Sequence, residues 1–126
     1  MNDAIEQLKL LATNVEYCAG IGLWYFNYCG YLMVYIPGYD SSNTIRICIP
    51  HFDSIRHYDS KILSIAINET NREVKYVKVV TLGNGSISIN YDHKYDGLND
   101  LRSMLLHMLK TLCFAAEYLK SKLSEK

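Results

Sequence analysis

The sequence predicts an α+β protein in which a mostly antiparallel, five-stranded sheet carries helices on one face, in two layers. Three observations predict this class. Aromatic and β-branched residues dominate regions 23–49 and 75–91, where turn residues interrupt them. An Asn-Gly pair separates two such runs in the second region. Apolar residues at helical spacing occupy both ends of the chain and a short middle segment. The predicted order is helix, three strands, helix, two strands, helix, in a single domain spanning residues 1–126.

The first predicted helix runs from Asp3 to Ala19, and one apolar stripe of it faces the core. The stripe consists of Ile5, Leu8, Ala12, Val15 and Ala19. Gly20 is placed to end this helix, because glycine is favoured just beyond a helix C-terminus.

Residues 23–36 predict two strands joined by a tight turn at Cys29 and Gly30. Side chains alternate between the faces of a strand, so two sets separate in the second strand. We assign the aliphatic set to the core and expect the other set to face outward. The core set is Leu32, Val34 and Ile36, and the outward set is Tyr31, Met33 and Tyr35.

The third strand follows a polar loop, Pro37 to Asn43, and buries one face made of alternate isoleucines. Its outward residues Arg46 and Cys48 lie beside the outward face of the second strand if the two strands pair. Large rings and methionine on an outward face are typical of binding surfaces. We therefore expect a protein-binding surface formed by Tyr31, Met33, Tyr35, Arg46 and Cys48. A second copy of the chain or residues 51–59 would cover the same face equally well.

A short helix begins at Asp59 or Ser60, places Ile62, Ile65 and Ala66 on one side, and ends in an asparagine pair. We expect Asn71 to close the helix and Asn68, one turn earlier, to bind the following strand. The alternative is an amide pair that binds a ligand.

Two strands, Lys75 to Leu82 and Ser86 to Tyr91, flank Gly83-Asn84-Gly85, which predicts a hairpin with a two-residue turn. A long amphipathic helix follows, beginning at Asp96 or Asn99 and covering the sheet. Its apolar stripe is Leu98, Leu101, Leu105, Met108, Leu112, Ala115, Leu119 and Leu123.

The order of elements resembles the type III secretion chaperone-like fold. Residues 60–123 also resemble the bacterial YbjN-type family of sensory-transduction regulators: a helix ending in Asn68-Glu69-Thr70-Asn71, a hairpin at Lys75 to Asn90, an acidic link at Asp92 to Asp96, and a long closing helix. This resemblance implies a small cytoplasmic protein without catalysis, often a homodimer, that acts by binding other proteins. The helix from Ser60 to Asn71 resembles the dimer-forming helix of the chaperone fold.

Composition argues against several partners. Thirteen basic residues balance thirteen acidic ones, so no net field attracts nucleic acid or an anionic membrane. The four cysteines have no CxxC spacing, which favours reduced thiols in the cytoplasm. Cys48 and His51 are one isolated pair of zinc-ligand types, so we expect no metal and no cofactor.

No two candidate catalytic residues have a spacing that brings them together. The sequence therefore favours a non-catalytic, cytoplasmic protein-binding module, either chaperone-like or a regulatory adaptor, over an enzyme. The alternative is a small-ligand-binding protein or enzyme whose pocket, between sheet and helices, is lined by Tyr, His and Cys.

Overall fold

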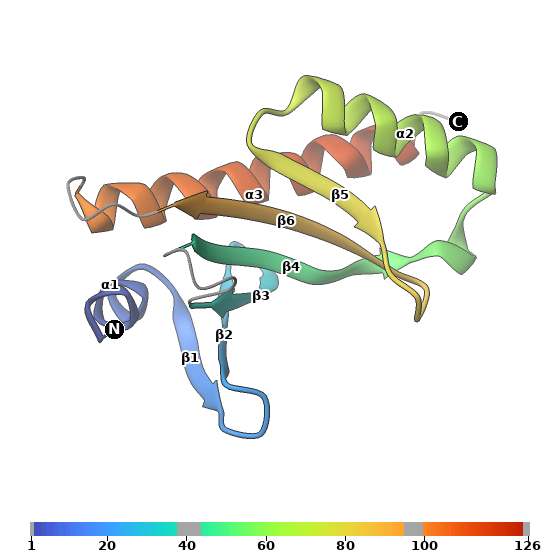
Figure 1. Cartoon of the computed structure of the whole chain (residues 1–126). Helices are drawn as coiled ribbons and strands as arrows, with labels where there is room; N and C mark the ends of the chain where they lie inside the picture. Colours follow the sequence, from blue (N-terminus) through green and yellow to red (C-terminus); the bar gives the residue numbers. More distant parts are fainter. Residues whose placement is uncertain (1, 38–43, 95–99, 125–126) are drawn as a thin grey trace.

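The computed structural model describes residues 2–37, 44–94 and 100–124, which form three α-helices and one antiparallel sheet of six strands (Figure 1). The predicted α+β class is confirmed, and the predictions of five strands and of their exact order are wrong. The strands lie in the order β1-β2-β3-β4-β6-β5. The elements are α1 (Asn2–Leu11), β1 (Thr13–Cys18), β2 (Leu23–Tyr28), β3 (Tyr31–Ile36), β4 (Thr44–Ser54), the short 3₁₀ helix η1 (Ile55–His57), α2 (Ser60–Glu73), β5 (Val77–Thr81), β6 (Ser86–Lys94) and α3 (Leu101–Leu123).

Strand β1 takes the place of the second half of the predicted first helix. Helix α1 ends at Leu11, and Asn14 has a φ of 55°, which a right-handed helix does not accommodate. Thr13 and Val15 are β-branched and fit a strand better than a helix. Only the first part of the apolar stripe is therefore helical, and Leu8 is its most deeply buried residue.

The side chains of β3 point the opposite way from the prediction. Met33 and Tyr35 are 0% and 2% exposed, whereas Leu32 is 51% exposed. Tyr35 lies opposite the buried Ile47 of β4, which places it on the inner face of the sheet. Both faces of β3 are apolar. The alternation of side chains therefore separates two faces but does not show which one is inner, and choosing the wrong face reverses the direction of every side chain. The assignment of Tyr31, Met33 and Tyr35 to the outward face is wrong.

Helix α3 supplies much of the core and packs against the inner face of the sheet, while α1 and α2 both pack against α3. Its buried residues are Met104, Leu105, Met108, Leu109, Leu112, Ala115, Ala116, Leu119 and Leu123. Asp100 occupies the N-cap position. The predicted starts, Asp96 and Asn99, and the first stripe residue, Leu98, lie outside the described residues. No helix among the described residues is long and apolar enough to cross a membrane.

Helix α2 begins as predicted, with Asp59 as its N-cap: the carboxylate accepts hydrogen bonds from the backbone N–H groups of Lys61 and Ile62. The buried side is rotated from the predicted one. Leu63, Ala66 and Thr70 are buried, whereas Ile65 is 57% exposed. Polar Thr70 fits the core because its hydroxyl donates to a carbonyl one turn earlier, at 2.8 Å.

The β5–β6 hairpin is confirmed, with a three-residue loop in place of the predicted two-residue turn. Leu82 N–H bonds the Ser86 carbonyl, and Gly85 N–H bonds the Leu82 carbonyl, both at 2.9 Å. Gly85 alone in this loop has a positive φ, 89°. A glycine in this conformation closes a three-residue hairpin loop without strain.

Candidate functional site

Asn71 joins α2 to β5 through both ends of its side-chain amide. Its Nδ2 donates to the Val79 carbonyl at 3.1 Å, and its Oδ1 accepts from the Val79 N–H at 2.7 Å. The prediction that Asn71 closes the helix is wrong, because α2 continues to Glu73 and the Val74 N–H closes it. The prediction of an asparagine that binds the next strand is right in kind, but this role belongs to Asn71 and not to Asn68.

The two bonds from Asn71 reach the free edge of the sheet. Strand β5 is the last strand, and the bond between Leu82 and Ser86 shows which of its residues bond to β6. Backbone groups alternate in an antiparallel ladder, so the N–H and C=O groups of Val77, Val79 and Thr81 point away from β6. Asn71 therefore occupies the position that a further strand would take at Val79.

A groove of about 750 Å³ lies between α2 and the free edge of β5. Its apolar part includes Leu63 and Ile67 from the helix and Val80 from the strand, and Asn68 lies on its wall. The full lining is Ile55, Ser60, Leu63, Ser64, Ile67, Asn68, Asn71, Lys78, Val79, Val80 and Thr81. This mixture of apolar side chains and open backbone suits an extended peptide.

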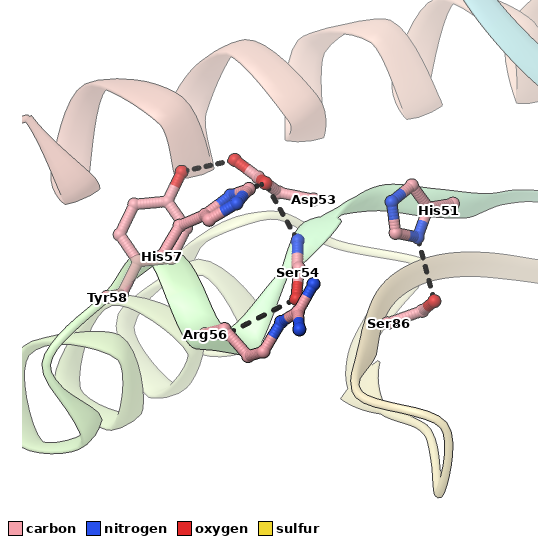
Figure 2. Close-up of polar contacts among 7 residues, drawn as sticks. All are labelled: His51, Asp53, Ser54, Arg56, His57, Tyr58 and Ser86. Atoms are coloured by element: carbon pink, nitrogen blue, oxygen red, sulfur yellow. Dashed lines mark hydrogen bonds and ion pairs between the residues drawn. The ribbon is translucent and has the colours of Figure 1, made fainter.

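A second pocket, of about 540 Å³, lies where the end of β4 and η1 meet the turn of the β5–β6 hairpin. Its lining is His51, Ser54, Ile55, Arg56, His57, Gly83, Asn84, Gly85 and Ser86, and we call it the hairpin pocket. Figure 2 shows most of its polar side chains. It adjoins the groove, because Ile55 lines both.

In the hairpin pocket, His51 Nδ1 lies 2.7 Å from the Oγ of Ser86 (Figure 2). The irregularity in β4 between Ile49 and Asp53 inserts extra residues opposite β6, and this bulge brings the exposed His51 to the buried Ser86. Ser86 is held from the other side, since its N–H donates to Asn84 Oδ1 at 2.9 Å.

Asp53 is the centre of a second polar group, which shares His57 with the hairpin pocket. Its carboxylate accepts hydrogen bonds from Ser54 N–H at 2.7 Å, from the Tyr58 hydroxyl at 2.5 Å and from His57 Nδ1 at 2.6 Å (Figure 2). Burial acts to raise the pKa of Asp53, but the three hydrogen bonds outweigh it and lower the pKa. Burial and the bond to Asp53 raise the pKa of Tyr58 to about 12, so Tyr58 remains a donor.

These groups do not form a catalytic triad among the described residues. Asp53 bonds to His57 and Tyr58, while His51 bonds to Ser86, so the serine–histidine pair has no carboxylate to orient it. In residues 2–37, 44–94 and 100–124, no three His, Cys, Asp or Glu side chains are grouped as a metal site requires.

The predicted aromatic surface is dispersed. The Tyr31 hydroxyl donates to the Glu117 carboxylate on α3. Burial raises the pKa of Tyr31 most, and the bond to Glu117 raises it further. Met33 and Tyr35 lie in the core. Arg46 and Cys48 do lie on the outer face. Arg46 makes a bidentate pair with Asp92 of β6, at 2.6 and 2.9 Å, and Cys48 is buried between its neighbours.

A third pocket, of about 420 Å³, lies between the end of β6 and the start of α3. Its rings are stacked: Tyr76 lies over Tyr91, and His107 meets both edge-on. His107 Nδ1 is 3.1 Å from the Tyr91 hydroxyl. Tyr76 has a φ of 77°, uncommon for a residue with a side chain, and is 68% exposed.

Comparison with protein-family models gives no match, and comparison with curated proteins gives none either.

Only weak signals for the two main sites are present in the sequence. The pattern of zinc-ligand types includes Cys48 and His51, but the partner of His51 is Ser86, from a strand far along the chain. A signal for the groove was available in the asparagine pair, whose spacing predicted that one amide binds the next strand.

Proposed function

We propose that this protein is a non-catalytic, cytoplasmic protein-binding module that takes up an extended segment of another protein in the groove between α2 and β5. The observation that carries the proposal is the free edge of β5 beside the groove. Val77, Val79 and Thr81 direct backbone donors and acceptors toward it. An extended segment that adds to an edge strand forms main-chain hydrogen bonds, and its side chains enter the adjoining groove.

Asn71 regulates access to this edge. A bound segment forms new hydrogen bonds at Thr81, and at Val79 it exchanges the two amide bonds of Asn71 for two backbone bonds. An exchange of hydrogen bonds is nearly neutral in free energy, so the affinity comes from Thr81 and from apolar burial against Leu63 and Ile67. Without a partner, Asn71 protects the edge from non-specific pairing.

The resemblance of residues 60–123 to the YbjN-type family and to the type III secretion chaperone-like fold supports the same proposal, because the resemblance implies regulation by protein binding. It also supports a homodimer. A second copy would use the same edge of β5, so partner binding and self-association compete for it.

A proline at Thr81 tests the proposed edge. Proline removes the outward N–H of Thr81 without breaking a bond to β6, because Thr81 points away from that strand. Thr81→Val is the matched control, since it keeps the N–H. Peptides selected from a random display library on the wild type are then titrated against both variants. We expect Thr81→Pro to lose binding and Thr81→Val to retain it; equal binding to both variants, or no selected peptide, contradicts the proposal.

The alternative function, a small-ligand-binding protein, is favoured by the pocket between β6 and α3. Two tyrosines and two histidines line it, and stacked rings suit a flat aromatic ligand. A thermal-shift screen of aromatic metabolites against the wild type and Tyr76→Ala tests it. A hit that stabilises only the wild type supports this alternative, and the absence of any hit opposes it.

A further inference from the structure

The hairpin pocket is lined by neutral and basic side chains. Arg56 supplies a guanidinium, and His51 and His57 supply imidazoles, while no Asp or Glu is among its described lining residues. Arg56 is exposed, and no acidic partner of it occurs within residues 2–37, 44–94 and 100–124. The carboxylate of Asp53, three residues before Arg56, is bonded to three donors and does not line the pocket.

Two side chains of the pocket accept hydrogen bonds from nearby backbone N–H groups, and their own donor groups remain available to a ligand. The Oδ1 of Asn84 accepts from the Ser86 N–H, and the Nδ2 of Asn84 can donate to a ligand. Ser54 Oγ accepts from the Arg56 N–H at 3.3 Å, which leaves the hydroxyl proton of Ser54. The same bonds fix these side chains, so little conformational entropy is lost when they bind a ligand.

Hydrogen bonds at Nδ1 also fix the two histidines of the pocket. An ionised carboxylate only accepts, so His57 Nδ1 carries the proton that it donates to Asp53, and Nε2 of His57 stays unused. Ser86 occupies Nδ1 of His51 and likewise leaves Nε2. The Nε2 of His51 is a donor in the tautomer whose Nδ1 accepts the Ser86 hydroxyl, whereas the Nε2 of His57 is an acceptor, because the proton of that ring is on Nδ1.

We propose that the hairpin pocket binds a small phosphate-class anion. Arg56 provides charge and a two-pronged set of N–H donors, and Asn84, Ser54 and His51 provide donors from other directions. A tetrahedral oxyanion uses such an arrangement fully, because its oxygens accept from several sides. The anion is either free inorganic phosphate or the phosphate ester of a peptide. The second source is compatible with the adjoining groove, since Ile55 lines both cavities.

Inorganic phosphate is the first probe, because its binding does not depend on the proposed peptide function. It is titrated into the ¹⁵N-labelled protein at constant ionic strength, and amide signals are followed by NMR. We expect saturating shifts confined to residues 54–57 and 83–86, with Kd on the order of 1 mM for so open a site. Shifts that spread over the surface without saturation overturn the proposal.

Arg56→Gln and Arg102→Gln remove the same charge from two exposed positions, and only Arg56 lines the pocket. We expect Arg56→Gln to weaken phosphate binding about tenfold or more, the effect of losing one charge-assisted pair. Arg102→Gln should bind like the wild type. Equal weakening in both variants shows an effect of net charge and overturns the site.

A second titration distinguishes the sources of the anion. A selected groove-binding peptide is compared with and without phosphoserine, and with inorganic phosphate, on the wild type and Arg56→Gln. If phosphorylation strengthens peptide binding only when Arg56 is present, the anion is a peptide phosphate. If inorganic phosphate binds and phosphorylation has no effect, the site takes a free anion. Loss of peptide binding in Thr81→Pro with phosphate binding retained separates the two sites.

Discussion

The side-chain amide of Asn71 makes two hydrogen bonds with the backbone of Val79, one as donor and one as acceptor. A single side chain therefore satisfies a backbone position at the edge of the sheet that is otherwise left to water or to another strand.

We expect Asn71→Ala to lower the free energy of unfolding by about 1–2 kcal/mol, since both bonds are lost and the helix loses its link to β5. Urea denaturation measures the change. Asn68→Ala is the matched control, because Asn68 is exposed on the same helix; it should change stability by less than about 0.5 kcal/mol. Equal effects of the two changes would show that the amide bonds contribute nothing specific.

The freed edge should also increase self-association of Asn71→Ala in light scattering.

Tyr35→Ser tests the orientation of β3. We expect it to lower the free energy of unfolding by about 3–5 kcal/mol, because the ring is almost fully buried in the core. Leu32→Ser, three positions earlier on the outer face, should cost far less. Thermal unfolding of the two variants decides the matter, and a reversed order of stability would restore the predicted orientation.

The hydrogen bonds around Asp53 predict a dependence of stability on acid pH. The pKa of Asp53 is lower in the folded protein than its ordinary 3.8, so the folded state is favoured while the carboxylate is ionised. This contribution is fully present above the ordinary value and is lost as the pH falls through the lower, folded-state pKa. Asp53→Asn should therefore have a flatter stability profile below about pH 4. Parallel profiles of the two proteins would contradict the prediction.

The cysteines should differ in their rates of alkylation. Burial raises the pKa of Cys48 to about 11 and, together with a hydrogen bond to Cys29, that of Cys113 to about 12. Thiolate is the reactive form, so both should react slowly with iodoacetamide at pH 8, whereas Cys29 is exposed and should react first. Mass spectrometry of timed samples gives the order, and denaturant should abolish it. A Cys113 that reacts as fast as Cys29 in the folded protein would refute this expectation.

Prediction from sequence succeeded where one local signal decides the outcome. Asp59 begins α2, and a glycine-containing loop joins β5 to β6, because a cap and a turn depend on a few neighbouring residues. The long stripe of α3 was predicted because its apolar residues recur at helical spacing along the whole element.

Prediction from sequence failed where the structure of a segment depends on residues far from it in the chain. The inward orientation of Tyr35 depends on its pairing with Ile47, and the apolar character of both faces of β3 conceals it. The apolar residues of region 12–18 are spaced as in a helix. Asn14 and its β-branched neighbours nevertheless form strand β1, which pairs with β2. The hairpin pocket depends on the bulge in β4, and a bulge changes which side chains meet without leaving a pattern in the strand itself.

Strand β4 pairs with β3 on one side and with β6 on the other, so it is the seam between the two halves of the chain. Strands β1 to β4 follow one another as neighbours, whereas the β4–β6 pairing skips α2 and β5. We expect this non-local pairing to form more slowly than the pairings of β1 to β4, because a long loop must be ordered first. A chain cut between η1 and α2 would yield two fragments, neither of which holds the whole core, that meet along β4. Fused to the two parts of a reporter enzyme, they would reassemble only when this seam closes.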